Sequence, residues 1–307
     1  MNPITILLVV LGVFTAGYLF IVIQGLIRDA REGAVLVGSP LMWVISFIAN
    51  FFDTLGVGSY ATTTSMVRAA KLIPDEKIPG SLNVGYVLST VLQAFLFIGV
   101  VPVGVKTLIS LIASAVLGAH FGAGVVSSWP RRKIQIGMGA CLLLAAVIML
   151  IRLKFFTYPA DALAIELTGV KWMIGLVAIF VLGALMTLGI GLYAPCLILI
   201  SFLGMNEKAA FPIMMGACAF LMPVAVAKFV KARAYYPPVI VPMIVAGIPA
   251  VYLAFKKFSD LDMYWVKVIV ICVVTFAGIS MLWTAYRERG TAAAARPASL
   301  ESASASA

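Results

Sequence analysis

The stretch NFFDTLGVGSYATTT, residues 50–64, places an acid and several hydroxyl groups inside a long apolar part of the chain. Asp53 is the only carboxylate between Glu32 and Asp75. A charged carboxylate at membrane depth costs several kcal/mol unless it is hydrated or paired, so such a residue is a functional candidate. Because burial and a nearby anion both favour the protonated acid, one hypothesis is that Asp53 couples anion movement to a proton. The alternative is that it caps the glycine break by accepting backbone N–H bonds.

A second stretch repeats the first. TLGVGSYA at 54–61 and TLGIGLYA at 187–194 are identical at six of eight positions, and the same offset of 133 places Pro79 on Pro212. We interpret the chain as an internal duplication whose halves each open with a glycine-broken segment, a plan common in transporters. The alternative is that two glycine-rich kinks arose for helix packing alone.

Such breaks can bind an anion. A fresh helix is expected to start near Ser59 and near Leu192, and its first N–H groups have no intrahelical partner and carry the positive end of the helix dipole. Two such ends that converge from opposite faces would form an anion site without a basic side chain. Glycines allow close approach of the anion, and hydroxyl and amide groups add donors. The predicted substrate-binding residues are Asn50, Thr54, Gly56, Gly58, Ser59, Tyr60, Thr62, Asn83, Thr187, Gly189, Gly191, Tyr193 and Pro195.

The composition indicates the environment of these residues. Of 307 residues, 63% are apolar and 11% are charged, and the mean hydropathy is +1.11. This predicts an all-α integral membrane protein. The net charge of +10 does not indicate nucleic-acid binding, because the basic residues lie between apolar segments, as in cytoplasmic loops. The four cysteines lie in apolar runs and there is one histidine, so we expect free thiols, no metal and no cofactor.

Two apolar segments, 34–72 and 170–205, are too long for one upright crossing, and each is interrupted by a glycine pair. If both return to the side from which they came, 14 of the 22 basic residues lie on one side. If both cross, the split is 12 to 10, so the positive-inside rule favours re-entrant segments and three full crossings in each half. The halves are then inverted repeats. The expected organisation is an N-terminal helix and loop over 1–33, repeats over 34–151 and 152–285, and a disordered cytoplasmic tail over 286–307.

The paired TLG-x-G-x-YA motifs resemble those of the TauE/SafE sulfite exporter family, also called the toluene-sulfonate uptake permease family. The resemblance covers residues 34 to 285 and implies a secondary transporter of sulfite, sulfonates or related organic anions in the bacterial inner membrane. Ser59 and Leu192 stand where the family commonly has a third glycine, which leaves the substrate open. An enzyme would need a nucleophile with a base or a metal cluster, and we find neither pattern. An anion channel or a membrane assembly factor remains the alternative, and the sequence leaves open whether the protein is a homo-oligomer.

Overall fold

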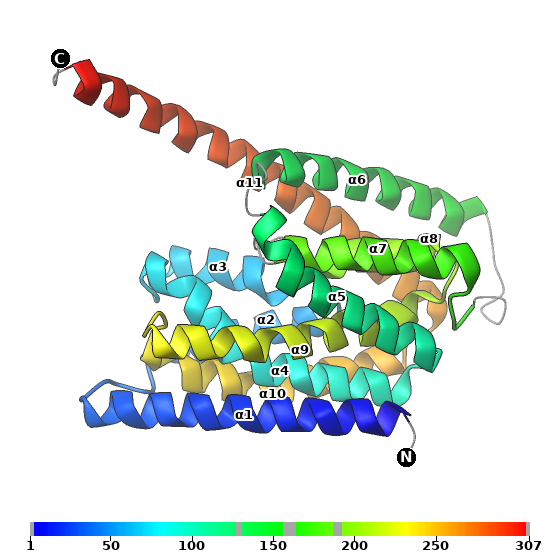
Figure 1. The fold of residues 1–307 in the computed structure, drawn as a ribbon, viewed down its shortest axis with the longest axis horizontal. Helices are drawn as coiled ribbons and strands as arrows, with labels where there is room; N and C mark the ends of the chain where they lie inside the picture. Colours follow the sequence, from blue (N-terminus) through cyan, green and yellow to red (C-terminus); the bar gives the residue numbers. More distant parts are fainter. Residues whose placement is uncertain (1–2, 127–130, 156–163, 187–191, 305–307) are drawn as a thin grey trace.

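The computed structural model describes residues 3–126, 131–155, 164–186 and 192–304. Every long element in these ranges is an α-helix, which confirms the all-α prediction. α1 lies along one edge of the molecule, and α6 and α11 lie along the opposite edge (Figure 1). The helices are α1 (Pro3–Arg31), α2 (Pro40–Thr54), α3 (Ser59–Ala69), α4 (Ile78–Val100), α5 (Val105–Val126), α6 (Arg131–Phe155), α7 (Gly169–Met186), α8 (Tyr193–Phe202), α9 (Ala210–Lys231), α10 (Pro237–Ser259) and α11 (Met263–Ser304), with single 3₁₀ turns η1 (Asp75–Lys77) and η3 (Glu207–Ala209).

Seven helices in the described ranges are long and apolar enough to cross a bilayer. They are α1, α4 with η1, α6, α7, α9 with η3, α10 and the first part of α11, while α2, α8 and the described apolar part of α5 are shorter. Large apolar side chains such as Val13 and Phe20 on α1 are more than 60% exposed, as expected of a surface that faces lipid. The chain is a multi-pass membrane protein.

The first long apolar segment is broken where the glycines predict. Ser39 caps the start of α2 by accepting the Leu41 N–H, and Pro40 occupies the first helical position, where its missing N–H costs little. α2 ends at Thr54, and Gly56 and Gly58 follow with φ of +97° and +87°. Residues with a β-carbon rarely adopt this conformation, so the glycine pair makes the turn into α3 possible.

The two halves have the same order of elements. A shift of 133 residues carries α3 onto α8, α4 onto α9, α5 onto α10 and α6 onto α11, within about one residue at most helix starts. The C-terminal caps of α3 and α8 also match. After α3, Lys71 has a φ of +50°, and the N–H of the next residue, Leu72, donates to the Val67 carbonyl. After α8, Gly204 has a φ of +87°, and the N–H of the next residue, Met205, donates to the Ile200 carbonyl. This is the Schellman arrangement in both halves. This order of helices is the one expected of the internal duplication that the motifs predict.

One end of the bundle, which we name the Arg233 end, gathers the start of α2 and the chain that follows α3. The Gly38 N–H before α2 donates to the Pro238 carbonyl at 2.8 Å. Lys77, in η1 after α3, donates to the Arg233 carbonyl, and the Arg233 guanidinium pairs with Glu32 beyond α1 at 2.6 Å. α2 and α3 therefore leave from one end of the bundle and return to it.

The opposite end, which we name the Asn206 end, does the same for α7 and α8. The Asn206 N–H, just after α8, donates to the carbonyl of Ala164, which precedes α7. Lys208 donates to the Leu261 carbonyl, so the connection from α10 to α11 lies there too. The two glycine-interrupted helix pairs thus start from opposite ends of the bundle.

The first helix of each half, α2 or α7, packs on a helix of the other half. α2 packs on α10 and α7 packs on α5, while α4 packs on α9 and α6 on α11 between the halves. The α5–α7 crossing is close because a β-carbon on Gly118 would lie 1.9 Å from the Phe180 carbonyl oxygen, and one on Gly183 would lie 2.2 Å from that of Ala115. Gly118 and Gly183 therefore allow α5 and α7 to pack closely.

The described end of the chain, for which the sequence predicts a disordered tail, belongs to α11 in the structure. α11 continues to Ser304 and projects away from the other helices (Figure 1). The alanines of this segment are the strongest helix formers, and the segment extends a long membrane helix that is already nucleated. The remaining domain boundaries stay predictions.

Candidate functional site

Asp53 lies in the last turn of α2 with only 3% of its surface exposed. One carboxylate oxygen accepts the Ser59 N–H, the first of α3, at 2.6 Å, and the other accepts the Gln93 side-chain amide at 2.9 Å. Asp53 therefore bridges the glycine break and fixes α3 to α2 and α4. The capping alternative requires this Ser59 contact, and a carboxylate at a helix N-terminus is stabilised by the helix dipole. A proton-coupling role stays a prediction.

Gln93 on α4 is the partner that the sequence-based set of substrate-binding residues omits. Its amide donates to Asp53 and also to the Thr54 hydroxyl at 3.0 Å, and the side chain is completely buried. A glutamine in the middle of an apolar helix is a signal in itself. Its partner is not readable from the sequence, because Gln93 and Asp53 are 40 residues apart.

The other candidates of the first half surround this contact. Asn50 and Thr54 are fully buried on α2, where the Asn50 amide donates to the Ser46 carbonyl and the Thr54 hydroxyl to the Asn50 carbonyl. The Thr62 hydroxyl donates to carbonyls of its own helix at Gly58 and Ser59. These groups are close to the break, but part of their hydrogen-bonding capacity is already used locally.

The second break is described only on its two sides. Thr187, Gly189 and Gly191 lie outside the described residues. Tyr193 starts α8, and buried Pro195 follows in its first turn, where a missing N–H costs little. The Cys218 thiol of α9 lies 3.8 Å from the Met186 sulfur at the end of α7.

The first interruption packs against α8 and α9 of the second half. A β-carbon on Gly56 would contact Leu197 of α8 at 3.4 Å and Phe211 of α9 at 3.6 Å. Tyr193 lies within electrostatic range of both Asp53 and Tyr60, its counterpart in the first half. The structure thus brings together the candidates of both halves that it describes, except one.

That exception is Asn83. It lies in the second turn of α4, near the Arg233 end, and its amide donates to the Pro79 carbonyl of its own helix at 2.9 Å. Gln93 lies ten residues further along α4, which is about 15 Å at the rise of an α-helix. The sequence grouped Asn83 with the break because both are polar groups in apolar segments, but only Gln93 reaches it.

The electrostatics of the two helix starts differ. Asp53 already occupies the Ser59 N–H, so a second anion at the start of α3 would face a carboxylate. At α8 the N-cap residue is Leu192, whose apolar side chain makes no capping hydrogen bond. The prediction that both helix starts together bind an anion stays a prediction, and the Asp53 carboxylate makes the start of α3 the less favourable of the two for an anion.

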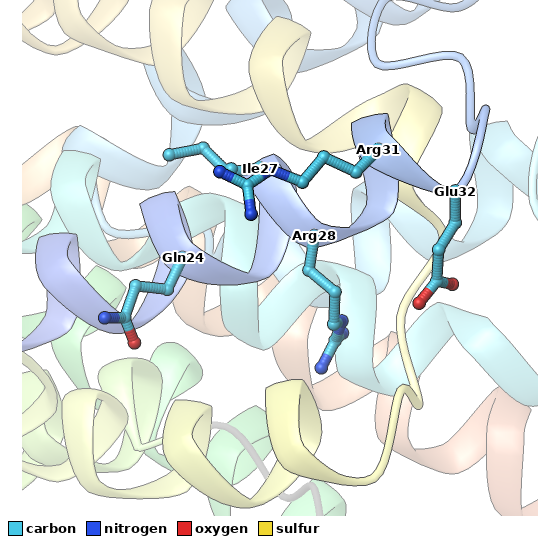
Figure 2. Close-up of a pocket in the computed structure, with 5 residues that line it drawn as sticks. All are labelled: Gln24, Ile27, Arg28, Arg31 and Glu32. Carbon is cyan, nitrogen blue, oxygen red and sulfur yellow. The ribbon is translucent and has the colours of Figure 1, made fainter.

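A surface hollow of about 500 Å³ lies away from the breaks, at the C-terminal end of α1. Figure 2 shows its lining, which comprises Gln24, Ile27, Arg28, Arg31 and Glu32. Arg28 pairs with Asp29 at 3.1 Å, and the Arg233 hydrogen bond holds the pKa of Glu32 below its ordinary value of 4.5. The Glu32–Arg233 ion pair joins the end of α1 to the α9–α10 turn, and the hollow lies outside the candidate site.

The described residues contain no cluster of three or more histidine, cysteine or acidic side chains that could hold a metal ion. Comparisons with family models, with characterised proteins and with solved structures gave no match.

Proposed function

We propose that the protein is a secondary transporter of a small anion, such as sulfite, a sulfonate or a related organic anion, in the bacterial inner membrane. The anion binds between the two glycine-interrupted helix pairs, beside the start of α8. The halves are inverted repeats, and each interrupted pair is re-entrant. The resemblance of the TLG-x-G-x-YA motifs supports the substrate class.

Re-entry is supported by where the helices begin and end. α2 and α3 span about 22 and 16 Å, and α8 about 15 Å, against a hydrocarbon core of about 30 Å. α7 has 18 residues, enough by length to cross, yet α8 returns the chain to the Asn206 end from which α7 started. A broken backbone at this depth is tolerated only when it is buried in protein or lines a cavity.

The observation that carries the proposal is the contact of the first interruption with α8, where Gly56 packs against Leu197. Transporters built from inverted repeats place their sites where discontinuous helices meet near the midplane. An uncapped helix start and two tyrosine side chains, Tyr60 and Tyr193, border this place, and each can interact with an anion without a permanent positive charge.

The distribution of charge supports a cytoplasmic Arg233 end and C-terminus. Among the basic residues whose side chains the structure describes, those in helix termini and turns at that end are more numerous than those at the Asn206 end. The former are Arg28, Arg31, Arg68, Lys71, Lys77, Arg132, Lys133, Lys228, Lys231, Arg233 and Arg287, and the latter are Lys106, Lys171, Lys208, Lys256, Lys257 and Lys267.

Reconstitution into liposomes tests the proposal. Sulfite, thiosulfate, taurine, sulfoacetate and short carboxylates are supplied to vesicles with and without the same anion inside. We expect saturable uptake and counterflow for at least one of them. A channel would give neither, and an assembly factor would move no anion.

Gly58→Val provides the matched variant. Gly58 has a φ of +87° but open space around the position of a β-carbon, so valine would disturb the backbone of the break without a direct clash. Gly137→Val on α6 is the control, because a β-carbon at Gly137 would also meet no atom within 4 Å and the backbone there has no positive φ. We expect Gly58→Val to insert normally and to lose counterflow, while Gly137→Val keeps it. Equal counterflow in both would mean that the break serves only packing.

A further inference from the structure

A seam of buried polar side chains runs between α2 and α4 next to the break. Asn50 and Thr54 are one turn apart on α2, and Ser89 and Gln93 are one turn apart on α4; all four are fully buried. Gln93 donates to the Thr54 hydroxyl at 3.0 Å, which joins the two helices at one level. One turn away, the Ser89 hydroxyl and the Asn50 amide both approach Gly247 of α10. They lie 2.0 and 3.1 Å from the position that a β-carbon on Gly247 would occupy.

Three oxygens in this seam have no hydrogen-bond partner: Asn50 Oδ1, Gln93 Oε1 and Ser89 Oγ. The amide orientations follow from chemistry. The Asn50 Nδ2 faces the Ser46 carbonyl and the Gln93 Nε2 faces the Asp53 carboxylate, so exchanging nitrogen and oxygen would bring acceptors against acceptors. The unpartnered amide atoms are therefore both carbonyl oxygens. Buried acceptors without a partner are costly, so such a group needs a reason to be there.

The fold does not require this polarity. A shift of 133 residues carries Asn50 onto Gly183, Ser89 onto Met222 and Gln93 onto Val226, and it carries Asp53 onto Met186. The second half thus has apolar or small residues at the four matching positions. At the α2–α10 crossing the glycine is instead on α10, where Gly247 leaves room for Asn50 and Ser89.

The charge of Asp53 also has no basic counterpart nearby in the chain. Residues 34–67, all of α4 and α10 up to Phe255 contain no lysine or arginine. Arg68, the first basic residue after the break, pairs with Asp75 at 2.9 Å. An ionised carboxylate at this depth is costly unless a positive charge accompanies it.

We propose that the seam binds a sodium ion, with ligands from Asn50 Oδ1, Ser89 Oγ and Gln93 Oε1, beside the carboxylate of Asp53. Hard cations prefer oxygen ligands, and transporters with broken helices hold Na⁺ with oxygen ligands next to the break. One carboxylate balances a monovalent ion, whereas a divalent ion would leave an excess positive charge in apolar surroundings.

The part of this inference that concerns coupling between sodium and the anion rests on the proposed function. A sodium ion beside Asp53 offsets the charge that would repel an anion at the α8 start, so each ion would strengthen the binding of the other. Sodium binding itself does not depend on anion transport.

The test measures sodium binding without any candidate substrate. Purified protein is unfolded thermally in sodium gluconate, potassium gluconate and N-methylglucamine gluconate at equal ionic strength. We expect a saturable rise of the melting temperature in Na⁺ alone. Ser89→Ala should weaken the apparent sodium affinity about tenfold, the effect of losing one ligand of roughly hydrogen-bond strength. Gln93→Leu should do the same.

Ser114→Ala is the matched control, because Ser114 is a buried serine on α5 whose hydroxyl donates to the Leu176 carbonyl at 2.7 Å. It should lower the melting temperature in every salt and leave the sodium response unchanged. Equal stabilisation by Na⁺ and K⁺, or an unchanged sodium affinity in Ser89→Ala, would overturn the inference. So would stabilisation that follows acidification rather than Na⁺, which would assign the seam to water and a proton. A protein that binds Na⁺ and moves no anion would overturn the proposed function and leave this site standing.

Discussion

Replacing Asp53 with asparagine tests whether the carboxylate holds the break together. The carboxylate accepts from Ser59 and from Gln93. Asparagine can still accept the Ser59 N–H through its oxygen, but its nitrogen then faces the nitrogen of Gln93. One hydrogen bond to a charged group is lost, which is worth about 1.5 to 3 kcal/mol. Removing a buried charge offsets part of this loss, so we expect a net destabilisation of about 1 to 2 kcal/mol.

The assay is reversible unfolding of the purified protein in mixed detergent, followed by circular dichroism. Gln93→Glu in the Asp53→Asn background restores a carboxylate opposite the asparagine nitrogen, and we expect the double variant to regain more than half of the loss. A double-mutant cycle then gives the coupling free energy. If Asp53→Asn is as stable as the natural protein and Gln93→Glu rescues nothing, this reasoning about the break is refuted.

The same variants separate the two roles considered for Asp53. Under proton coupling, Asp53→Asn in proteoliposomes keeps anion-for-anion exchange but loses acceleration by a pH gradient. If Asp53 only caps the break, Asp53→Asn loses both anion exchange and its acceleration by pH because the protein is less stable. Both activities then return in the double variant with Gln93→Glu. Acceleration by pH that persists in a stable Asp53→Asn protein would exclude the coupling role.

Three further outcomes are expected. In a cysteine-free background, a cysteine at Asp75 should react with impermeant maleimide from the cytoplasm and one at Glu166 only from outside; labelling of both from one side would contradict the opposed ends. Gly118→Ala, whose β-carbon would meet a backbone oxygen at 1.9 Å, should reduce stability by at least about 2 kcal/mol, whereas Gly137→Ala should be neutral or slightly stabilising in the same unfolding assay. The pKa of Glu32 is lowered in the folded protein, so its contribution to folding stability is present above pH 4.5 and is lost as the pH falls through the lower folded pKa. Glu32→Gln should remove this part of the pH dependence of the melting temperature. An unchanged pH profile would argue against the ion pair.

The sequence by itself determined the membrane class and the position of the first break, and it predicted an internal duplication. Apolar runs set the helices, because a backbone in lipid must satisfy its own hydrogen bonds. Gly56 and Gly58 set the interruption through their positive φ, and the matched motifs predicted that the second half follows the same plan. These features follow from neighbouring residues, which is why they can be read along the chain.

The tertiary structure decided which groups meet. Asn83 and Gln93 are equally polar and lie on one helix, yet only Gln93 reaches Asp53, because α2 ends beside the middle of α4. The capped start of α3 and the uncapped start of α8 also follow from this contact and from Leu192 at the matching position of Ser59. Contacts between helices depend on how they cross. In this fold α2 packs on α10 and α7 packs on α5, and no local pattern in the sequence encodes these contacts.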